Sequence, residues 1–229
     1  MDQDFLKSLP QLMDISCVKA DNSMEEIEQM IQAAWKYRCA CIFTLPAFAG
    51  LTVKELAGSG VKTGGAVGFP SGGDTSRAKL YQAGELLQLG CKELDMVINQ
   101  TALKAHMDSY IMDETSSIVK EAGKIPVKVI LEISNLNEEE ISRGCNLIIQ
   151  AGAEYVKSGT GWAGVPTTVR DIQKISEIVK GHVKIKAAGG IRNLENMYEM
   201  YQWGCSRFGI SLKSALEILK TYKQTKLYQ

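Results

Sequence analysis

The stretch EYVKSGTGWAG, residues 154–164, contains the pattern from which the fold can be predicted. A short apolar run ends on Lys157, and small residues then open into a loop. About thirty residues later VKIKAAGGIRN, residues 183–193, repeats this design with Lys186. A strand-like run followed by a loop and a helix-like run is the repeating unit of parallel α/β sheets.

Eight short apolar runs occur along the chain, at residues 12–16, 39–45, 64–70, 93–99, 127–133, 154–159, 183–188 and 206–211. Between them lie amphipathic segments whose apolar residues recur three and four positions apart, as in a helix that buries one face. The clearest of these cover residues 23–38, 75–90, 137–152, 167–181 and 211–224, and Ser23 and Glu26 have the spacing of a capping box. We therefore predict eight strands and eight helices in strict alternation, with the strands parallel.

Eight strand–helix units in 229 residues predict an α/β fold of the (β/α)8 TIM-barrel type. The alternative is a doubly wound open sheet, which normally has fewer strands and a single phosphate-binding switch point. No linker, low-complexity run or change of composition divides the chain. We therefore expect one TIM-barrel domain over residues 1–229.

The overall charge argues against several classes of function. Lys plus Arg and Asp plus Glu each number 26, so the formal charge is zero and gives no electrostatic case for nucleic acid or an anionic membrane. The N-terminus is acidic and does not resemble a signal peptide, and no window approaches a membrane-spanning length of apolar residues. We expect a cytoplasmic protein with a small-molecule partner.

The six cysteines are scattered and include no CxxC pair. Most lie in apolar segments, which is typical of buried free thiols in a reducing compartment. Cys39 and Cys41 would share one face of a strand, but no histidine accompanies them. We therefore expect no zinc site.

Charged residues in the strands indicate where the site lies. Barrels carry their active sites at the C-terminal ends of the strands, and Lys157 and Lys186 occupy such positions on the sixth and seventh. Asp95 interrupts an otherwise apolar fourth strand, where an unpaired charge would be costly to bury. Asp95 is either part of a structural ion pair or a catalytic carboxylate that faces the lysines. Further charged residues lie at Asp14 and, on the fifth strand, at Lys128 and Glu132.

Two lysines on adjacent strands favour Schiff-base chemistry. Burial and a neighbouring positive charge both lower the pKa of a lysine, which keeps a free amine available near neutral pH. Such an amine attacks a carbonyl to form a Schiff base, while a carboxylate such as Asp95 moves protons through water. Lys184 has the same strand parity as Lys186, but we expect it to reach solvent at the opposite end of the barrel.

Glycines after the seventh strand predict a phosphate site. The segment AAGGIR and the eighth-strand segment RFGIS match the position where barrels bind phosphate with loops and a helix N-terminus. Gly189 and Gly190 would let backbone N–H groups approach an anion, and Arg192 would add positive charge. The alternative is that these are simple turn glycines. The glycine-rich loop 68–76 lacks the lysine of a nucleotide P-loop and is interpreted as a rim loop.

Several of these segments, in order and spacing, resemble the deoxyribose-phosphate aldolase family: VGFPSG, ELDMVIN, VKVILE, EYVKSGTG and IKAAGGIR. The resemblance extends from about Asp14 to Ile218. It implies a class I aldolase on a (β/α)8 barrel that needs no metal or other cofactor. The implied reaction is reversible cleavage of 2-deoxy-D-ribose 5-phosphate to D-glyceraldehyde 3-phosphate and acetaldehyde, a step of deoxyribonucleotide catabolism. Family members form dimers or tetramers, which implies a homodimer or homotetramer here.

The resemblance also implies residue roles. Lys157 would form the Schiff base, Lys186 would tune it, and Asp95 would transfer protons. Six residues fall where the family holds the substrate phosphate: Gly161, Gly189, Gly190, Arg192, Gly209 and Ser211.

The chain departs from the family pattern at several positions near the expected pocket: Leu45, Gly64, Gly65, Gly159, Trp162 and Leu212. Contacts at such positions set specificity, so a Schiff-base aldolase for a different phosphorylated sugar is an alternative. A catalytically silent sugar-phosphate-binding barrel is a second alternative. Some family members place a C-terminal tyrosine near the site; Tyr228 would either do this or lie in a frayed tail.

Overall fold

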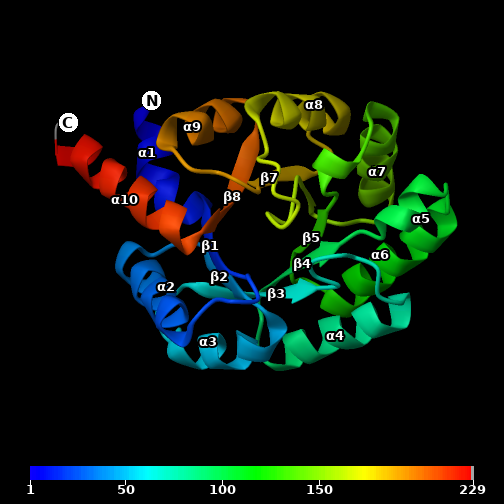
Figure 1. Ribbon diagram of the computed structural model, residues 1–229, viewed down its shortest axis with the longest axis horizontal. Coiled ribbons are helices and arrows are strands. Elements are labelled where there is room, and N and C mark those ends of the chain that lie inside the picture. The colour runs from blue at the N-terminus through cyan, green and yellow to red at the C-terminus, as the bar shows by residue number, and fades with distance from the viewer. Residues whose placement is uncertain (228–229) are drawn as a thin grey trace.

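The strands form a closed parallel barrel in chain order, β1 to β8, and β8 pairs with β1 to close it (Figure 1). The computed structural model describes the backbone of residues 1–227 and the side chains of residues 1–224. The strands are β1 (Met13–Cys17), β2 (Cys41–Thr44), β3 (Lys62–Val67), β4 (Glu93–Val97), β5 (Val127–Ile130), β6 (Tyr155–Lys157), β7 (Lys184–Ala188) and β8 (Cys205–Ser211). The predicted (β/α)8 barrel is confirmed.

Helices surround the barrel on the outside (Figure 1). They are α1 (Gln3–Ser8), α2 (Met24–Tyr37), α3 (Ala49–Glu55), α4 (Ser76–Gln88), α5 (Gln100–Lys104), α6 (Asp108–Ala122), α7 (Glu138–Gln150), α8 (Val169–Val179), α9 (Leu194–Gln202) and α10 (Leu212–Leu227). Short 3-10 turns lie at Leu9–Leu12, Pro46–Phe48 and Ile133–Asn135.

Strict alternation of eight strands and eight helices is wrong in detail, because α1 precedes the first strand and α5 is added after the fourth. The N-terminal helix α1 forms because Asp2 caps it, and it buries Phe5 and Leu6. The ring of Phe5 packs against Tyr198 and Tyr201 of α9. Those apolar contacts attach α1 to the layer of helices outside the barrel, near α9 and α10 (Figure 1).

Local sequence signals account for the helix starts. The predicted capping box of α2 is confirmed: the Ser23 side chain accepts from the Glu26 N–H, and the Glu26 side chain accepts from the Ser23 N–H. Reciprocal caps of this kind satisfy N–H groups that a helix leaves unpaired at its first turn. All six cysteines are buried and free, as predicted. No helix within residues 1–227 is long and apolar enough to cross a membrane.

Each strand has an apolar side toward the helices and a second side toward the barrel interior. Ile15, Val129, Val156 and Ile185 belong to the apolar layer that the helices cover. The interior would ordinarily be filled by branched apolar side chains. Here it holds seven charged side chains, each no more than 8% exposed: Asp14, Glu93, Asp95, Lys128, Lys157, Lys186 and Arg207. So many buried charges must be paired with one another, and their pairing defines the site.

Candidate active site

The residues predicted for the site gather in one cavity of about 720 Å³, which is built from loops at the C-terminal ends of the strands. All nine line it: Asp95, Lys157, Gly161, Lys186, Gly189, Gly190, Arg192, Gly209 and Ser211. This is the end of a barrel at which such folds carry their chemistry. Lys184, in contrast, is exposed and pairs with Glu154 at 2.7 Å, as expected for a residue at the opposite end.

One carboxylate oxygen connects the two predicted lysines. Lys157 and Lys186 are register neighbours on β6 and β7, so their side chains enter the barrel side by side. The Nζ atoms of Lys157 and Lys186 lie 2.8 Å and 2.6 Å from Asp95 Oδ2. Lys128, on the strand next to Asp95, donates to the other oxygen at 3.2 Å. Asp95 thus contacts three ammonium groups.

Burial lowers the pKa of the Lys157 ammonium to about 8, against an ordinary value of 10.5. Asp95 opposes this shift, whereas the positive charges of Lys186 and Lys128 add to it. Burial would by itself raise the pKa of Asp95, but the three lysines hold it well below its usual range. The site therefore contains an ionised carboxylate beside an amine that loses its proton near neutral pH.

Four charged residues not assigned to the site from the sequence support this arrangement from below: Asp14, Glu93, Lys128 and Arg207. Arg207 donates to Asp14 Oδ1 and, at 2.7 Å, to Glu93 Oε1. Lys128 donates to Glu93 Oε2. Lys186 Nζ lies 2.6 Å from Asp14 Oδ2, an ion-pair contact whose angle is not that of a hydrogen bond. The buried charges thus form one connected network.

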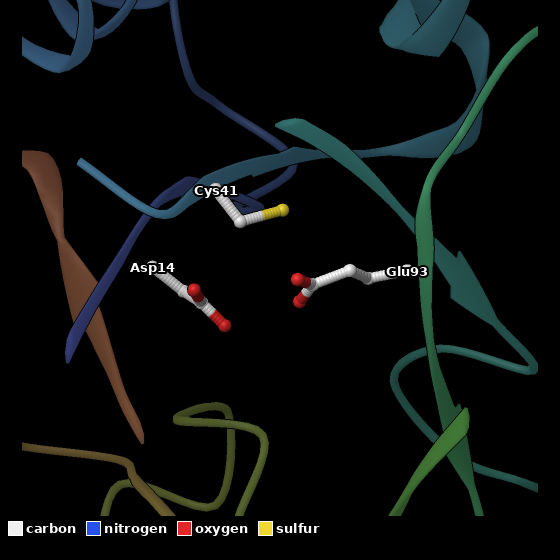
Figure 2. Close-up of side chains that lie close together, drawn as sticks. All are labelled: Asp14, Cys41 and Glu93. Atoms are coloured by element: carbon white, nitrogen blue, oxygen red, sulfur yellow. The ribbon is translucent and has the colours of Figure 1, made fainter. Parts of the chain in front are cut away.

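Two of these carboxylates and a thiol form the cluster that could be taken for a metal site. Asp14, Cys41 and Glu93 point toward a common space inside the barrel (Figure 2), with their donor atoms within 4.8 Å of one another. Lys186, Lys128 and Arg207 already bind both carboxylates. Burial, reinforced by Asp14 and Glu93, raises the pKa of Cys41 well above its ordinary value, so the thiol stays neutral. A divalent cation would have to displace these cationic partners, so the donor set does not fit a metal.

The ring of Phe43 lies beside the lysines, and it explains why Gly64 departs from the family pattern. The Nζ atom of Lys186 lies 4.2 Å from the ring centroid, and those of Lys128 and Lys157 lie 5.3 Å and 5.9 Å from it. A Cβ atom on Gly64 would lie 2.2 Å from a ring atom of Phe43. The aromatic ring takes the place of a side chain at position 64, and it stabilises the lysine ammonium groups through its face.

The opposite side of the cavity is rich in backbone N–H groups and positive charge. Gly189 and Gly190 follow β7 with positive φ angles of 95° and 72°, and exposed Arg192 lies two residues after Gly190. Ser211 ends β8, and its hydroxyl accepts from the N–H of Ser214 in the first turn of α10. Loop glycines, a cation and a helix N-terminus together suit an anion.

Gly209 has a more specific steric reason than the phosphate role that the resemblance implies. A Cβ atom at this position would lie 2.8 Å from the Cβ of Ala188 and 3.3 Å from Cε of Lys186. The missing side chain therefore leaves room for Lys186 to reach Asp95.

The loop after β6 is held by Glu132, which was predicted to lie on the fifth strand. That prediction is wrong: β5 ends at Ile130, and Glu132 has a left-handed backbone with φ of 54°. Its Oε2 accepts from the N–H of Thr160 at 3.1 Å and from the Thr160 hydroxyl. A Cβ on Gly159 would lie 2.7 Å from Glu132 Oε1 and 3.1 Å from the Ala188 carbonyl oxygen. Gly159 thus leaves room for the carboxylate that anchors the loop.

Trp162 ties three loops together at the cavity mouth. Its Nε1–H donates to the Val18 carbonyl at 3.0 Å, its N–H donates to Thr160 Oγ1 at 2.9 Å, and its ring meets Phe69 edge-on at 6.2 Å. Trp162 and Leu212 line the cavity; Leu45 is not among its lining residues. Tyr228 lies outside the described residues.

The same physical signal that identified Asp95, a charge within an apolar strand, could have found two of the residues that were missed. Glu93 lies two positions before Asp95 in β4 and therefore on the same face, and Arg207 interrupts β8 in the same way. Glu132 gives no such signal, because its role depends on a left-handed turn that the sequence does not reveal.

Known proteins resemble this chain over most of its length. The family model described as "DeoC/LacD family aldolase" matches residues 1–205. A deoxyribose-phosphate aldolase of Sinorhizobium medicae is 38% identical over 216 residues, which are 93% of this chain and 87% of that protein. The Bacillus subtilis enzyme of the same name is 35% identical over 89% of this chain and 92% of its own length. The structure of a tetrameric deoxyribose phosphate aldolase from Aeropyrum pernix superposes with a TM-score of 0.87 at 25% identity, covering 95% and 92% of the two chains.

Proposed function

The chain belongs to the DeoC/LacD family of aldolases, which are aldehyde-lyases, and on this premise we propose that it reversibly cleaves 2-deoxy-D-ribose 5-phosphate into D-glyceraldehyde 3-phosphate and acetaldehyde. The observation that carries the proposal is the shared oxygen of Asp95, which contacts both Lys157 and Lys186. Of the two lysines, Lys157 has the pKa lowered to about 8 and is the nucleophile.

The chemistry begins with the open-chain form of the sugar, which has an aldehyde at C1. The neutral amine of Lys157 adds to this carbon, and uptake of one proton with loss of water gives a protonated Schiff base. The C2–C3 bond then breaks: its electrons move toward the iminium nitrogen while the C3 hydroxyl loses its proton. Glyceraldehyde 3-phosphate leaves, and the enamine that remains takes a proton at C2 before hydrolysis releases acetaldehyde and the free amine. The positive nitrogen is what makes the bond cleavage accessible.

Asp95 is suited to the proton transfers. It is ionised, since the surrounding lysines hold its pKa well below the usual range, and it lines the cavity beside Lys157. A positioned carboxylate can receive the hydroxyl proton, directly or through water, and return it to carbon. Lys186, held between Asp95 and Asp14, keeps a positive charge beside the reacting nitrogen.

The anion-suited side of the cavity would hold the 5-phosphate. Backbone N–H groups after β7, the first turn of α10 and the side chain of Arg192 line the same cavity as Lys157. Phosphate held there would direct the C1 aldehyde toward the lysine, which converts binding into orientation.

Borohydride trapping tests the proposal. Incubation with acetaldehyde and sodium borohydride should leave an N-ethyl group on Lys157, which peptide mass spectrometry locates. A coupled assay should detect glyceraldehyde 3-phosphate from the deoxy sugar phosphate. Lys157→Ala should lose both signals. Lys184→Ala is the matched control, because Lys184 belongs to the neighbouring strand but is exposed outside the cavity, and it should retain both. An unmodified Lys157 together with no product would refute the proposed function.

Trp162 favours a second candidate, a Schiff-base aldolase for another phosphorylated sugar. Its indole narrows the mouth of the cavity beside Phe69 and Val165, all of which line the cavity. A panel of phosphorylated aldoses, with and without the 2-hydroxyl, separates the two: the second candidate requires a higher kcat/KM for another sugar than for the 2-deoxy pentose.

The same family relationship supports a homodimer or homotetramer, which light scattering on the purified protein tests. The six buried free thiols suit a reducing, cytoplasmic location.

A further inference from the structure

Six buried side chains form a closed ring of alternating charge, of which Asp14, Asp95 and Lys186 line the cavity and the other three do not. The contacts run in order through Asp95, Lys128, Glu93, Arg207, Asp14 and Lys186, and then back to Asp95. Each carboxylate uses both of its oxygens, and each cation bridges two carboxylates. The ring spans five strands, β1, β4, β5, β7 and β8, so it crosses the whole barrel interior.

The charges of the ring sum to zero, and the ammonium group of Lys157 adds a positive charge to this neutral set. The ring holds three anions and three cations, whereas Lys157 is a fourth cation whose one carboxylate partner among the described side chains is Asp95, through an oxygen already bound to Lys186. Lys62 also touches Glu93, at 3.0 Å, but its side chain is 48% exposed and water screens it. Surplus positive charge inside a protein is costly. The cation with the fewest acidic contacts loses its proton at the lowest cost in free energy, and that loss removes the surplus charge.

We propose that Glu93, Lys128 and Arg207 are positioning residues that set the charge of Lys157 without touching the substrate, because they complete a neutral ring to which Lys157 adds a further, uncompensated cation. The inference deepens the proposed function and rests on it for the role of Lys157. In this proposal the charge of Lys157 depends on residues across the barrel as well as on its neighbour Lys186.

Among the described side chains, the charged groups that face Lys157 belong to this network: Asp95 from β4, Lys128 from β5 and Lys186 from β7, with Asp14, Glu93 and Arg207 one contact further away. The uncharged ring of Phe43 from β2 also faces Lys157. Removing an anion from this set leaves more positive charge, so Lys157 should give up its proton more easily and its pKa should fall. Removing a cation should raise the pKa.

Removing an anion and removing a cation should therefore shift the pKa of Lys157 in opposite directions, which a merely structural role would not produce. Glu93→Gln should lower the pKa of Lys157, and Arg207→Gln should raise it, each by about one unit at an effective dielectric constant near 20. The measurement is the rate at which cyanate carbamylates Lys157 as a function of pH, followed by peptide mass spectrometry. Cyanate is small enough to enter the cavity that Lys157 lines, and this readout needs no turnover.

A charge-preserving variant and a variant of an exposed cation serve as controls. Arg207→Lys should return the midpoint close to that of the wild type. Lys62→Gln removes a cation that also touches Glu93 but is half exposed, so it should move the midpoint by much less than Arg207→Gln. Circular dichroism and thermal melting check that each variant folds. If either principal variant does not fold, Asp14→Asn replaces Glu93→Gln and Lys128→Met replaces Arg207→Gln, with the same expected signs.

The outcomes separate the ring from the proposed function. If the carbamylation midpoints of the two variants move in the same direction or do not move, the proposal that the ring sets the charge of Lys157 is wrong, even if acetaldehyde is still trapped on Lys157. Midpoints that split as expected support the ring, and if no aldehyde adduct forms in the same proteins, the failure belongs to the proposed function.

Discussion

Two buried lysines on either side of strand β4 differ in how their charge is matched. Lys79 of α4 is fully buried outside the barrel wall, where it pairs with the equally buried Glu114 of α6 at 2.8 Å and donates to the Val97 carbonyl at 2.9 Å. Lys157 lies inside the barrel and shares the carboxylate of Asp95 with two other lysines. Each lysine is buried and has one acidic partner, but Asp95 is shared by three lysines whereas Glu114 pairs with Lys79.

The difference indicates how a buried lysine serves structure or chemistry. Glu114 belongs to Lys79 alone, and its other oxygen accepts from Ser76 at the start of α4, so the pair joins two helices to the end of β4. Lys157 has a partner whose charge is already shared with two other cations, so its ammonium form is poorly compensated. A group with a perturbed pKa in a cleft, such as Lys157, marks a candidate functional site.

Replacing Asp95 should have the largest effect on activity. Asp95→Asn keeps the shape of the side chain but removes the negative charge, so turnover should fall by about 10² to 10⁴-fold as the proton transfers lose their carboxylate. The loss of an anion should also lower the pKa of Lys157, so trapping of acetaldehyde should persist. In this variant kcat should therefore fall while the fraction of Lys157 trapped with acetaldehyde stays close to that of the wild type.

The comparison would be broken if Asp95→Asn retained full turnover, since the shared carboxylate would then be structural. Glu114→Gln is the matched variant on the other side of β4. It should leave kcat per folded molecule near that of the wild type, because Glu114 is outside the cavity.

Replacing Lys79 should affect stability rather than chemistry. Lys79→Met leaves Glu114 buried without its cation, which typically costs about 3–5 kcal/mol. The double variant Lys79→Met/Glu114→Leu removes both charges and should recover most of that loss. Urea unfolding of the two variants measures the difference, and a double variant no more stable than the single one would contradict the account.

How much of this could be predicted from the sequence depends on the kind of signal. The eight strands and the lysines on β6 and β7 follow from apolar periodicity, which reports backbone geometry directly. Lys157, Lys186 and Asp95 stand out because each interrupts or ends an apolar run. Their meeting at one cavity needs only the rule that parallel strands end on the same side of a barrel.

The pairing of charges within the ring and the contacts that anchor the loops could not be predicted, because they depend on which side chains meet in the folded barrel. Glu93 and Arg207 belong to strands β4 and β8, and no local pattern indicates that their side chains meet. Glu132 reaches Thr160 only because its backbone is left-handed. The same holds for Gly159 and Gly64, whose missing side chains make sense only once the structure shows which neighbours use the space.

The smallest effect expected is on the pH dependence of stability, and it tests how well the charge of Lys157 is compensated without any substrate. The pKa of Lys157 is about 8 in the folded protein and near 10.5 in the unfolded chain. Between these values the unfolded state binds one more proton than the folded state, so the free energy of unfolding should rise with pH. From pH 7.5 to pH 9 the gain from this one group is about 1 kcal/mol.

Other groups titrate over the same range, so the informative quantity is the difference between the wild type and Lys157→Met in urea unfolding at each pH. The wild type should gain about 1 kcal/mol relative to Lys157→Met as the pH rises, because the methionine side chain of the variant has no proton to release. Parallel curves for wild type and Lys157→Met would mean that the ammonium group of Lys157 is fully compensated in the folded protein, and the account of its shared carboxylate would fail.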